Sequence, residues 1–158
     1  MNPLLVRLPA PDGFPFACLT LHGTAGQLTA LRFVEQGPDW VADDPLAARA
    51  AAALHGWCVS GQPLSDDLPL AAAATPFASR LRQRLLQTRP GQPVTYGALA
   101  AELGTSPRAI GAACRANPLP ILVPCHRVVA ASGLGGYAGA QSGPLPAAKA
   151  WLLAHESS

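Results

Sequence analysis

The sequence predicts a protein of mixed α and β structure with two domains: a small N-terminal α/β domain with an antiparallel sheet over residues 1–74, and a mostly helical C-terminal domain over residues 75–158. Three observations predict this. Residues 16–33 have the pattern of two paired strands, helical patterns dominate after residue 75, and the formal charge changes sign between the two halves. The expected boundary lies around residues 72–76.

The composition is that of a globular chain. Hydrophobic residues make up 49% of the 158 residues, and the mean hydropathy is +0.22, which argues against disorder. No apolar run has the length of a membrane span, and Arg7, Pro9 and Pro11 interrupt the N-terminus before a signal-peptide core could form. We therefore expect a cytoplasmic monomer with no membrane partner.

The charge is distributed unevenly. Residues 1–75 carry three arginines against seven acidic residues, a net charge of −4, whereas residues 76–158 carry seven arginines and Lys149, the only lysine, against two acidic residues, a net charge of +6. The second half is therefore either a unit that binds a polyanion or a domain with a solvated basic surface. The four cysteines form no CxxC pair, which indicates free thiols.

The N-terminal elements follow from local patterns. Residues 16–33 read as a β-hairpin with a glycine-containing turn. A helix follows, capped by Asp43 or Asp44 with Pro45 in its first turn, and its pattern runs to Gly56. The next segment reads as a linker with a short extended piece.

The first C-terminal helix begins at a clear capping signal. Thr75 precedes Pro76, which is the usual order of an N-cap and a first helical residue. The apolar face is predicted from helical spacing, and arginines occupy the other face. Its members are Phe77, Leu81, Leu85 and Leu86.

Two short helices then have the spacing of a helix-turn-helix. Ala100 lets the helices approach, Gly104 turns the chain, and Ile110 fills the core of the second helix. We expect Ser106 to be the N-cap of that helix and Pro107 its first residue. Many paired helices share this pattern without touching DNA, so the basic charge of this half is the observation that favours DNA.

The segment most suited to chemistry is LPILVPCHRVV, residues 119–129, in which residues 119–123 read as a short aliphatic strand; a glycine-rich loop follows it. Cys125 is either an inert buried thiol or a nucleophile. His126 is either a core histidine or a base that would make the thiolate available. A metal site is the weaker interpretation, because no second ligand pair stands at zinc spacing.

These residues resemble those of the O6-alkylguanine-DNA alkyltransferases. The resemblance is strong from about Thr75 to Glu156, and the hairpin resembles the opening hairpin of that family. The PCHRV motif is highly specific in this context. The matching segments are Asn117-Pro118, Ile121-Leu122-Val123, Pro124-Cys125-His126-Arg127-Val128, Gly136-Tyr137-Ala138-Gly139 and Trp151-Leu152-Leu153-Ala154-His155-Glu156.

The resemblance implies a DNA repair function in which an alkyl group moves irreversibly from O6-alkylguanine, with O4-alkylthymine as a further candidate, to Cys125. Displacement at saturated carbon suits a soft thiolate. By resemblance, His126 draws the thiol proton through a water, Glu156 orients the imidazole, and Asn117 holds the network together. Tyr96 matches the tyrosine that donates toward N3 of the leaving guanine.

The resemblance also implies a ribonuclease H-like N-terminal domain, a winged-helix-like C-terminal domain and flipping of the nucleotide from the minor groove of double-stranded DNA. Arg108 matches the arginine that fills the gap left in the duplex. The residues expected to contact DNA are Tyr96, Ser106, Arg108, Ala109, Arg115 and Arg127. The residues expected to line the pocket for the base are Cys114, Val128, Gly136, Tyr137 and Ala138.

Departures from the family pattern carry expectations of their own. The loop from Cys125 to Tyr137 is one residue shorter than usual, and the insert after Gly139 predicts a longer surface loop. Cys18, His22 and His55 do not reproduce the zinc ligands of some members, so we expect no metal and no cofactor.

Three alternatives stand beside the alkyl-transfer interpretation. A damage-recognition protein without alkyl transfer is one, although such proteins lack the acceptor cysteine that is present here. A cysteine hydrolase with multiple turnovers is another. A transcriptional regulator of this family is the third, but it would need a further domain.

Overall fold

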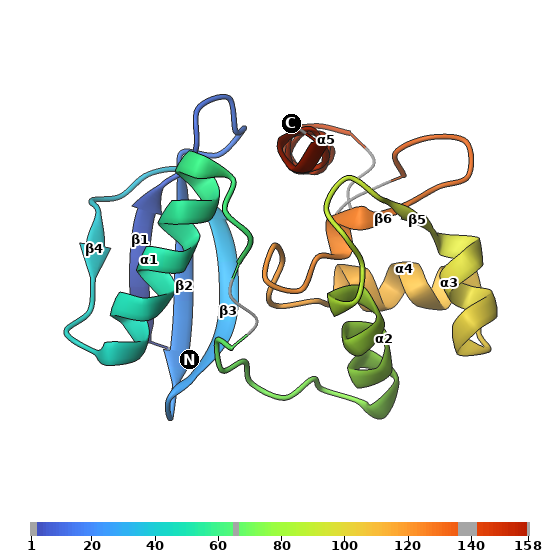
Figure 1. Ribbon diagram of the computed structural model, residues 1–158, viewed down its shortest axis with the longest axis horizontal. Coiled ribbons are helices and arrows are strands. Elements are labelled where there is room, and N and C mark those ends of the chain that lie inside the picture. Colours follow the sequence, from blue (N-terminus) through green and yellow to red (C-terminus); the bar gives the residue numbers. More distant parts are fainter. Residues whose placement is uncertain (1–2, 65–66, 136–141, 158) are drawn as a thin grey trace. The chain divides into compact units, whose positions relative to one another are not determined.

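The computed structural model describes residues 3–64, 67–135 and 142–157. The chain divides into an N-terminal unit, Met1–Ala71, and a C-terminal unit, Ala72–Ser158 (Figure 1). The predicted fold class is confirmed at the level of mixed α and β structure with an antiparallel sheet. No helix within the described ranges is long and apolar enough to cross a membrane.

The N-terminal unit is an antiparallel sheet with one helix packed on it, and its strand order is β3-β2-β1-β4. Helix α1 packs against β1 and β4 and buries alanines, leucines and Trp57 at helical spacing (Figure 1). This gives the unit a core between one face of the sheet and one helix. The elements are β1 (Leu4–Pro9), β2 (Cys18–Thr24), β3 (Gln27–Val34), β4 (Trp40–Val41) and α1 (Pro45–Ser60).

The predicted hairpin is present, and its turn has the expected chemistry. Ala25 and Gly26 connect β2 to β3 with φ values of 53° and 77°, and two consecutive left-handed residues match the twist of a two-residue hairpin. The sequence prediction omitted β1 and β4. Prolines at positions 3, 9 and 11 flank the short apolar run of β1, so its sequence does not have the pattern of a strand. The strand forms because it pairs with β2, for example through Leu8 with Leu19.

Helix α1 begins as predicted but ends later. The Asp44 side chain accepts a hydrogen bond from the backbone N–H of Leu46 at 2.7 Å, and Pro45 is in the first turn. The predicted end at Gly56 is wrong, because the helix continues to Ser60 and stops at Gly61, which has φ 66°. A glycine inside a helix weakens it only modestly, whereas a left-handed residue ends it.

The C-terminal unit is mostly helical, with a two-stranded parallel pair that joins its two halves. Strand β5 pairs with β6 through Val94 with Val128 and Thr95 with Val129. The start of the helix-turn-helix and the Cys-His segment are therefore held side by side (Figure 1). The elements are α2 (Pro76–Leu86), β5 (Val94–Thr95), α3 (Tyr96–Leu103), α4 (Pro107–Arg115), η1 (Cys125–Arg127, a 3-10 turn), β6 (Val128–Val129) and α5 (Pro144–Ser157).

Helix α2 begins as predicted. The Thr75 side chain accepts a hydrogen bond from the N–H of Ala78, and Pro76 is the first helical residue. Leu81 and Leu85 are buried, but Leu86 is 49% exposed, so its assignment to the apolar face was wrong. Leu86 lies one residue beyond the stripe that a period of 3.6 places against the core.

Helices α3 and α4 form the predicted helix-turn-helix. Gly104, with φ 68°, ends α3, and the Ser106 side chain caps α4 by accepting from the N–H of Ala109 at 3.1 Å. Ala100 and Ile110 are buried between the two helices, which contact each other. These are the contacts expected of a small residue and a branched residue at those spacings.

Residues 119–123 are not a strand. They form a buried turn in which Ile121 has φ 73°. Pro118 and Pro120 remove two N–H donors, and the side chain of Asn117 supplies hydrogen bonds that strand neighbours would otherwise have made. An aliphatic run without polar alternation looks the same whether it enters the core as a turn or as a strand.

Candidate active site

The Cys-His pair lies on the turn η1. Cys125 and His126 have 5% and 0% of their surface exposed, respectively. Backbone hydrogen bonds fix the turn, from Cys125 N–H to the Val123 carbonyl at 2.7 Å and from Arg127 N–H to the Pro124 carbonyl at 3.2 Å. Since β6 follows η1 at once and pairs with β5, the cysteine is held near the N-terminus of α3.

Asn117 secures the turn that leads into η1. Its Nδ2 donates to the Val123 carbonyl at 3.0 Å, and its Oδ1 accepts from the N–H of Leu119 at 3.0 Å. The side chain of Asn117 therefore makes hydrogen bonds with the backbone of this segment that a neighbouring strand would make in a sheet. This asparagine connects the end of α4 to the residues immediately before Cys125.

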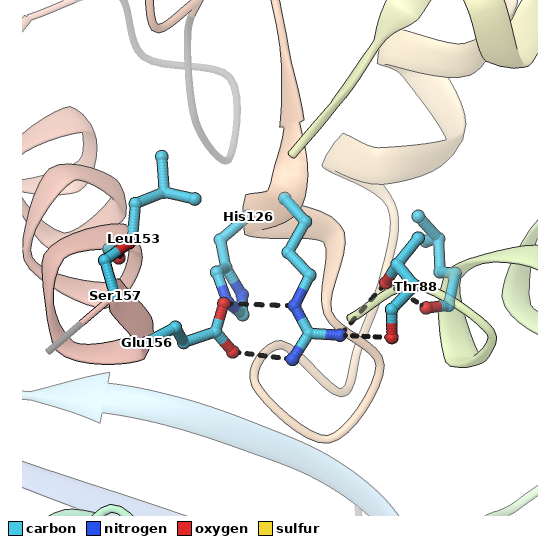
Figure 2. Close-up of polar contacts among 7 residues, drawn as sticks. Thr88, His126, Leu153, Glu156 and Ser157 are labelled. Carbon is cyan, nitrogen blue, oxygen red and sulfur yellow. Dashed lines mark hydrogen bonds and ion pairs between the residues drawn. The ribbon is translucent and has the colours of Figure 1, made fainter. Parts of the chain in front are cut away.

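His126 faces the carboxylate of Glu156, which comes from the last turn of α5. His126 Nε2 lies 2.9 Å from Glu156 Oε1, and the two side chains are 0% and 4% exposed (Figure 2). Both imidazole nitrogens are buried; in the described part of the chain Nε2 has this close contact with the carboxylate but no well-aligned hydrogen bond, and Nδ1 has no hydrogen-bond partner. One imidazole nitrogen is thus oriented by a carboxylate, and the other is available to accept a proton.

Arg127 binds the same carboxylate from another side. Its Nε donates to Glu156 Oε1 at 3.0 Å and its Nη2 donates to Oε2 at 2.7 Å. Its Nη1 donates to the carbonyl and the hydroxyl oxygen of Thr88 at 2.9 and 3.0 Å. The guanidinium is therefore fully engaged inside the unit, with 11% of the side chain exposed.

The ionisation of this network follows from burial and from these contacts. Burial lowers the pKa of His126, which outweighs the opposing effect of Glu156; the charges of Arg127 and Lys149 lower it further. Burial alone would raise the pKa of Glu156, but the hydrogen bonds from His126 and Arg127 outweigh burial and lower it to about 2. At neutral pH the network holds a carboxylate anion and a neutral imidazole.

A second group of side chains lies near the cysteine. Burial, followed by the charges of Cys114 and Cys125, raises the pKa of Tyr96. Lys149 is fully buried, and its Nζ lies 5.5 Å from the centroid of the Tyr96 ring. A Cβ added to Gly135, which has φ 76°, would come within 3.1 Å of Tyr96 and 3.6 Å of Lys149 Nζ. A glycine is needed there for both its backbone angle and its size.

Cys114 on α4 differs in character from a reactive thiol. Burial, and then the charge of Cys125, raises its pKa to about 12, although Lys149 acts in the opposite direction. Cys114 is therefore a protonated thiol at neutral pH. Of the other residues predicted to line a pocket, Val128 is fully buried, and Gly136, Tyr137 and Ala138 lie outside the described residues.

The residues predicted to contact DNA separate into two groups. Arg108 and Arg115 are exposed at the start and end of α4, Ser106 is its exposed cap, and Ala109 is half-buried. Arg127 does not belong with them. Its guanidinium is directed to Glu156 and Thr88, so we correct its assignment from a DNA contact to a member of the buried network.

The insert after Gly139 also differs from the prediction. Residues 144–148 form the first turns of α5 and not a surface loop. Proline is tolerated in the first turn of a helix, where its missing N–H has no partner to lose, and the alanines that follow favour helix. The part of the insert at residues 140 and 141 lies outside the described residues.

Within the described ranges no group of three His, Cys, Asp or Glu side chains is placed to hold a metal. The Cys18 thiol lies 3.8 Å from the Gly37 carbonyl, and His22 contacts Thr20 at 3.1 Å.

Sequence reasoning missed two parts of the site. Lys149 is buried and lies seven residues before Glu156, so both lie on the same face of α5 two turns apart. Its status as the only lysine, at that spacing, was a signal available in the sequence. Thr88 had no such signal, because its role depends on a loop that meets Arg127 only in the folded chain.

Comparisons with known proteins show which family this chain resembles. Residues 76–158 match the family described as 6-O-methylguanine DNA methyltransferase, DNA binding domain. The methylated-DNA–protein-cysteine methyltransferase of Metallosphaera sedula is 33% identical, over 78% of this chain and 79% of that protein. A DNA base-flipping protein of Thermus thermophilus is 42% identical, over 77% of this chain and 79% of that protein.

Solved structures extend the likeness over both units. The O6-methylguanine methyltransferase of Mycobacterium tuberculosis has a TM-score of 0.77 and 32% identity, covering 98% of this chain and 93% of that one. The structure of Mycobacterium tuberculosis OGT in complex with DNA has a TM-score of 0.74 and 31% identity, covering 96% and 91% of the two chains. This chain belongs to the 6-O-methylguanine DNA methyltransferase family.

Proposed function

We propose that this protein repairs DNA by transferring an alkyl group from O6-alkylguanine to the sulfur of its own Cys125, once per molecule. The observation that carries the proposal is the contact of 2.9 Å between His126 and Glu156 directly beside Cys125, in a chain of this family. A buried cysteine without an adjacent neutral base and an oriented carboxylate would be an ordinary core thiol.

The proposed step is a displacement at the alkyl carbon. Cys125 gives its proton, relayed by one water, to His126 Nδ1, and the thiolate sulfur forms a bond to the alkyl carbon while the bond from that carbon to O6 breaks. Tyr96 donates a proton to N3 of the departing guanine anion, exchange with water moves the proton from N3 to N1 to give normal guanine, and the proton that His126 took from Cys125 returns through water to Tyr96. The product is a thioether, which water does not cleave under mild conditions, so the protein does not turn over.

The buried polar groups prepare Cys125 and His126 for this step. The approach of Glu156 Oε1 to within 2.9 Å of His126 Nε2 favours the tautomer with its proton on Nε2 and so leaves Nδ1 as the proton acceptor, and the lowered pKa of His126 keeps that nitrogen unprotonated at neutral pH. Burial lowers the pKa of Lys149, against the opposite effect of Cys114 and Cys125, and in its protonated form this lysine near Tyr96 and Cys125 favours the thiolate over the thiol. No cofactor is required for any part of the step.

In this proposal the helix-turn-helix is the part of the protein that binds DNA. We assign Arg108, exposed at the start of α4, to the gap that the flipped nucleotide leaves, where its planar guanidinium can stack and donate hydrogen bonds. Ser106, Ala109 and Arg115 contact the DNA around it, with α4 in the minor groove. Such an interface reads little base sequence, which suits the repair of lesions at arbitrary positions.

The finer predictions on architecture belong to this proposal as well. We assign the ribonuclease H-like fold to residues 1–74 and the winged-helix-like fold to residues 75–158, which carry both the acceptor cysteine and the DNA contacts. The preferred substrate is double-stranded DNA with O6-alkylguanine, and the protein acts as a monomer in the cytoplasm.

A second candidate is a damage-recognition protein that flips the base without accepting the alkyl group. The 42% identity to the base-flipping protein of Thermus thermophilus favours this candidate. The presence of Cys125 beside His126 and Glu156 in one buried network favours transfer. The two candidates therefore differ in chemistry and not in their expected binding to DNA.

The test is to incubate the protein with a duplex that contains one O6-methylguanine and to measure restored guanine by nuclease digestion and chromatography. Transfer predicts that restored guanine rises to a plateau of one per protein molecule. Binding to the lesion with no restored guanine would support the recognition candidate. Restoration beyond one per molecule would indicate turnover and would contradict transfer to Cys125.

A further inference from the structure

Arg127 makes a three-part connection inside the C-terminal unit. Two of its nitrogens bind the two oxygens of Glu156, and the third binds the carbonyl and the hydroxyl oxygen of Thr88. Figure 2 labels Glu156 and Thr88 and marks these contacts with dashed lines. The Thr88 hydroxyl in turn donates to the carbonyl of Leu85 in α2. The guanidinium therefore joins η1, α5 and the loop after α2 at one point.

This connection fixes the plane of the Glu156 carboxylate. Oε1 is shared between Arg127 Nε at 3.0 Å and His126 Nε2 at 2.9 Å, and Oε2 is held by Arg127 Nη2 at 2.7 Å. A guanidinium fork on a carboxylate has a defined geometry, whereas a single ammonium contact would leave the carboxylate free to rotate. Arg127 thus determines how Glu156 is presented to the imidazole.

The same contact balances charge around the imidazole. A buried carboxylate with no other partner would pull a proton onto His126, and an imidazolium cannot accept the proton of Cys125. The charged groups that face His126 are Glu156 and Lys149 from α5 and Arg127 from η1. Arg127 supplies the positive charge that offsets Glu156 at direct contact distance.

We propose that Arg127 is a positioning residue for alkyl transfer, which aims the Glu156 carboxylate at His126 and neutralises its charge so that the imidazole stays a proton acceptor. This inference rests on the proposed function of Cys125. It differs from a merely structural role, because it concerns the protonation of His126 and not only the stability of the unit.

The experiment compares Arg127→Met with the wild-type protein over a range of pH, using alkylation by free O6-benzylguanine measured by intact-protein mass spectrometry. In the wild type the rate rises with pH as His126 loses its proton. In Arg127→Met the uncompensated charge of Glu156 favours the imidazolium, so the midpoint of the pH–rate profile moves to higher pH by about one to three units, as expected for an unbalanced charge at contact distance. An unchanged profile with a uniformly slower rate would overturn the proposal.

Two further variants separate charge from packing. The double variant Arg127→Met/Glu156→Gln removes both charges, so the midpoint of its pH–rate profile should return to the wild-type value or fall below it. Thr88→Val removes an uncharged contact of the same guanidinium and leaves the pH of the rise in place. A double variant that retains the displaced profile, or a Thr88→Val variant that acquires it, would contradict the proposal.

A direct titration of His126 distinguishes this inference from the proposed function. Histidine-labelled protein observed by NMR reports the protonation of His126 whether or not alkylation occurs. If the wild type is never alkylated, the proposed function fails, and the titration still decides whether Arg127 keeps the imidazole neutral. If Arg127→Met does not fold, Arg127→Lys retains the charge without the fork; a wild-type titration with slower alkylation supports the proposal, and a displaced titration overturns it.

Discussion

Oε1 of Glu156 lies 2.9 Å from Nε2 of His126, although the two residues belong to the last helix and to a short turn thirty positions earlier. Both side chains are almost fully withdrawn from solvent. Burial makes the contact strong and makes its loss costly, since a buried carboxylate without partners is far less stable than a solvated one. The consequences for DNA repair, stability and pH dependence can each be tested.

Arg108→Ala should slow repair of duplex DNA by about tenfold to a hundredfold, which corresponds to about 1.4–2.8 kcal/mol in the barrier. Reaction with free O6-benzylguanine should be unchanged, because only the duplex requires a nucleotide to be extruded. Single-turnover kinetics on both substrates provide the measurement. Arg115→Ala is the matched control, since loss of a phosphate contact should weaken DNA binding without slowing repair at saturating DNA. Equal slowing on both substrates would remove the role given to Arg108.

Asn117→Ala should destabilise the protein by about 1–3 kcal/mol, because the Leu119 N–H loses its acceptor and the Val123 carbonyl keeps only the Cys125 N–H as a donor next to the buried turn. Urea denaturation measures this change. Asn117→Asp keeps the acceptor for the Leu119 N–H and loses the donor to Val123, so its effect should be different from that of alanine and should vary with pH. A variant with wild-type stability and wild-type alkylation would show that the turn does not depend on Asn117.

Glu156 should make stability depend on pH in acid. Its pKa is held at about 2 by hydrogen bonds from His126 and Arg127 that outweigh burial, whereas an unfolded chain has a glutamate pKa of about 4.3. Its stabilisation is therefore complete above about pH 4.3 and is lost as the pH falls toward 2. His126, whose folded pKa is lowered by burial, adds a separate loss below about pH 6.5, where only the unfolded chain takes up that proton.

Urea denaturation of Glu156→Gln between pH 5 and pH 2 should show a flatter decline than the wild type, over about the window set by the two glutamate pKa values. Glu102→Gln is the control, because Glu102 is a paired carboxylate on an exposed surface, 47% exposed against 4% for Glu156. Its effect on the slope should be smaller, since surface ion pairs contribute little. Equal slopes for Glu156→Gln and the wild type would contradict the buried network.

Alkylation of Cys125 should itself destabilise the protein. The cysteine is 5% exposed on a tightly bonded turn, and added methylenes in a packed site typically cost about 1–3 kcal/mol. Calorimetry of the methylated and unmethylated proteins should therefore show a lower Tm after methylation and a larger decrease after benzylation. A benzylated protein as stable as the unmodified one would show that Cys125 opens onto free space.

The elements that the sequence predicts correctly are those decided by neighbouring residues. Thr75, Asp44 and Ser106 are followed directly by proline and cap their helices through contacts two or three positions away. The helix-turn-helix follows from small, turning and branched residues at fixed spacing. Such features depend on local sterics and hydrogen bonding, which a short window of sequence contains.

The features that escaped prediction depend on distant partners. Strand β1 is defined by its pairing with β2, and the turn at residues 119–123 depends on the side chain of Asn117. Arg127 is predicted to contact DNA, but the fold provides Glu156 and Thr88 as its buried partners. Charge and hydrophobicity do not say which residue will be close after folding, and this limits what pattern reasoning can establish about a site.

The most direct measurement is intact-protein mass spectrometry after incubation with a duplex that contains O6-methylguanine, followed by peptide mapping. The account predicts an increase by the mass of one methylene group, located on Cys125, and no increase in Cys125→Ala, which should still bind the duplex. An unmodified wild-type protein after prolonged incubation, or a methyl group on Cys114 in place of Cys125, would contradict it.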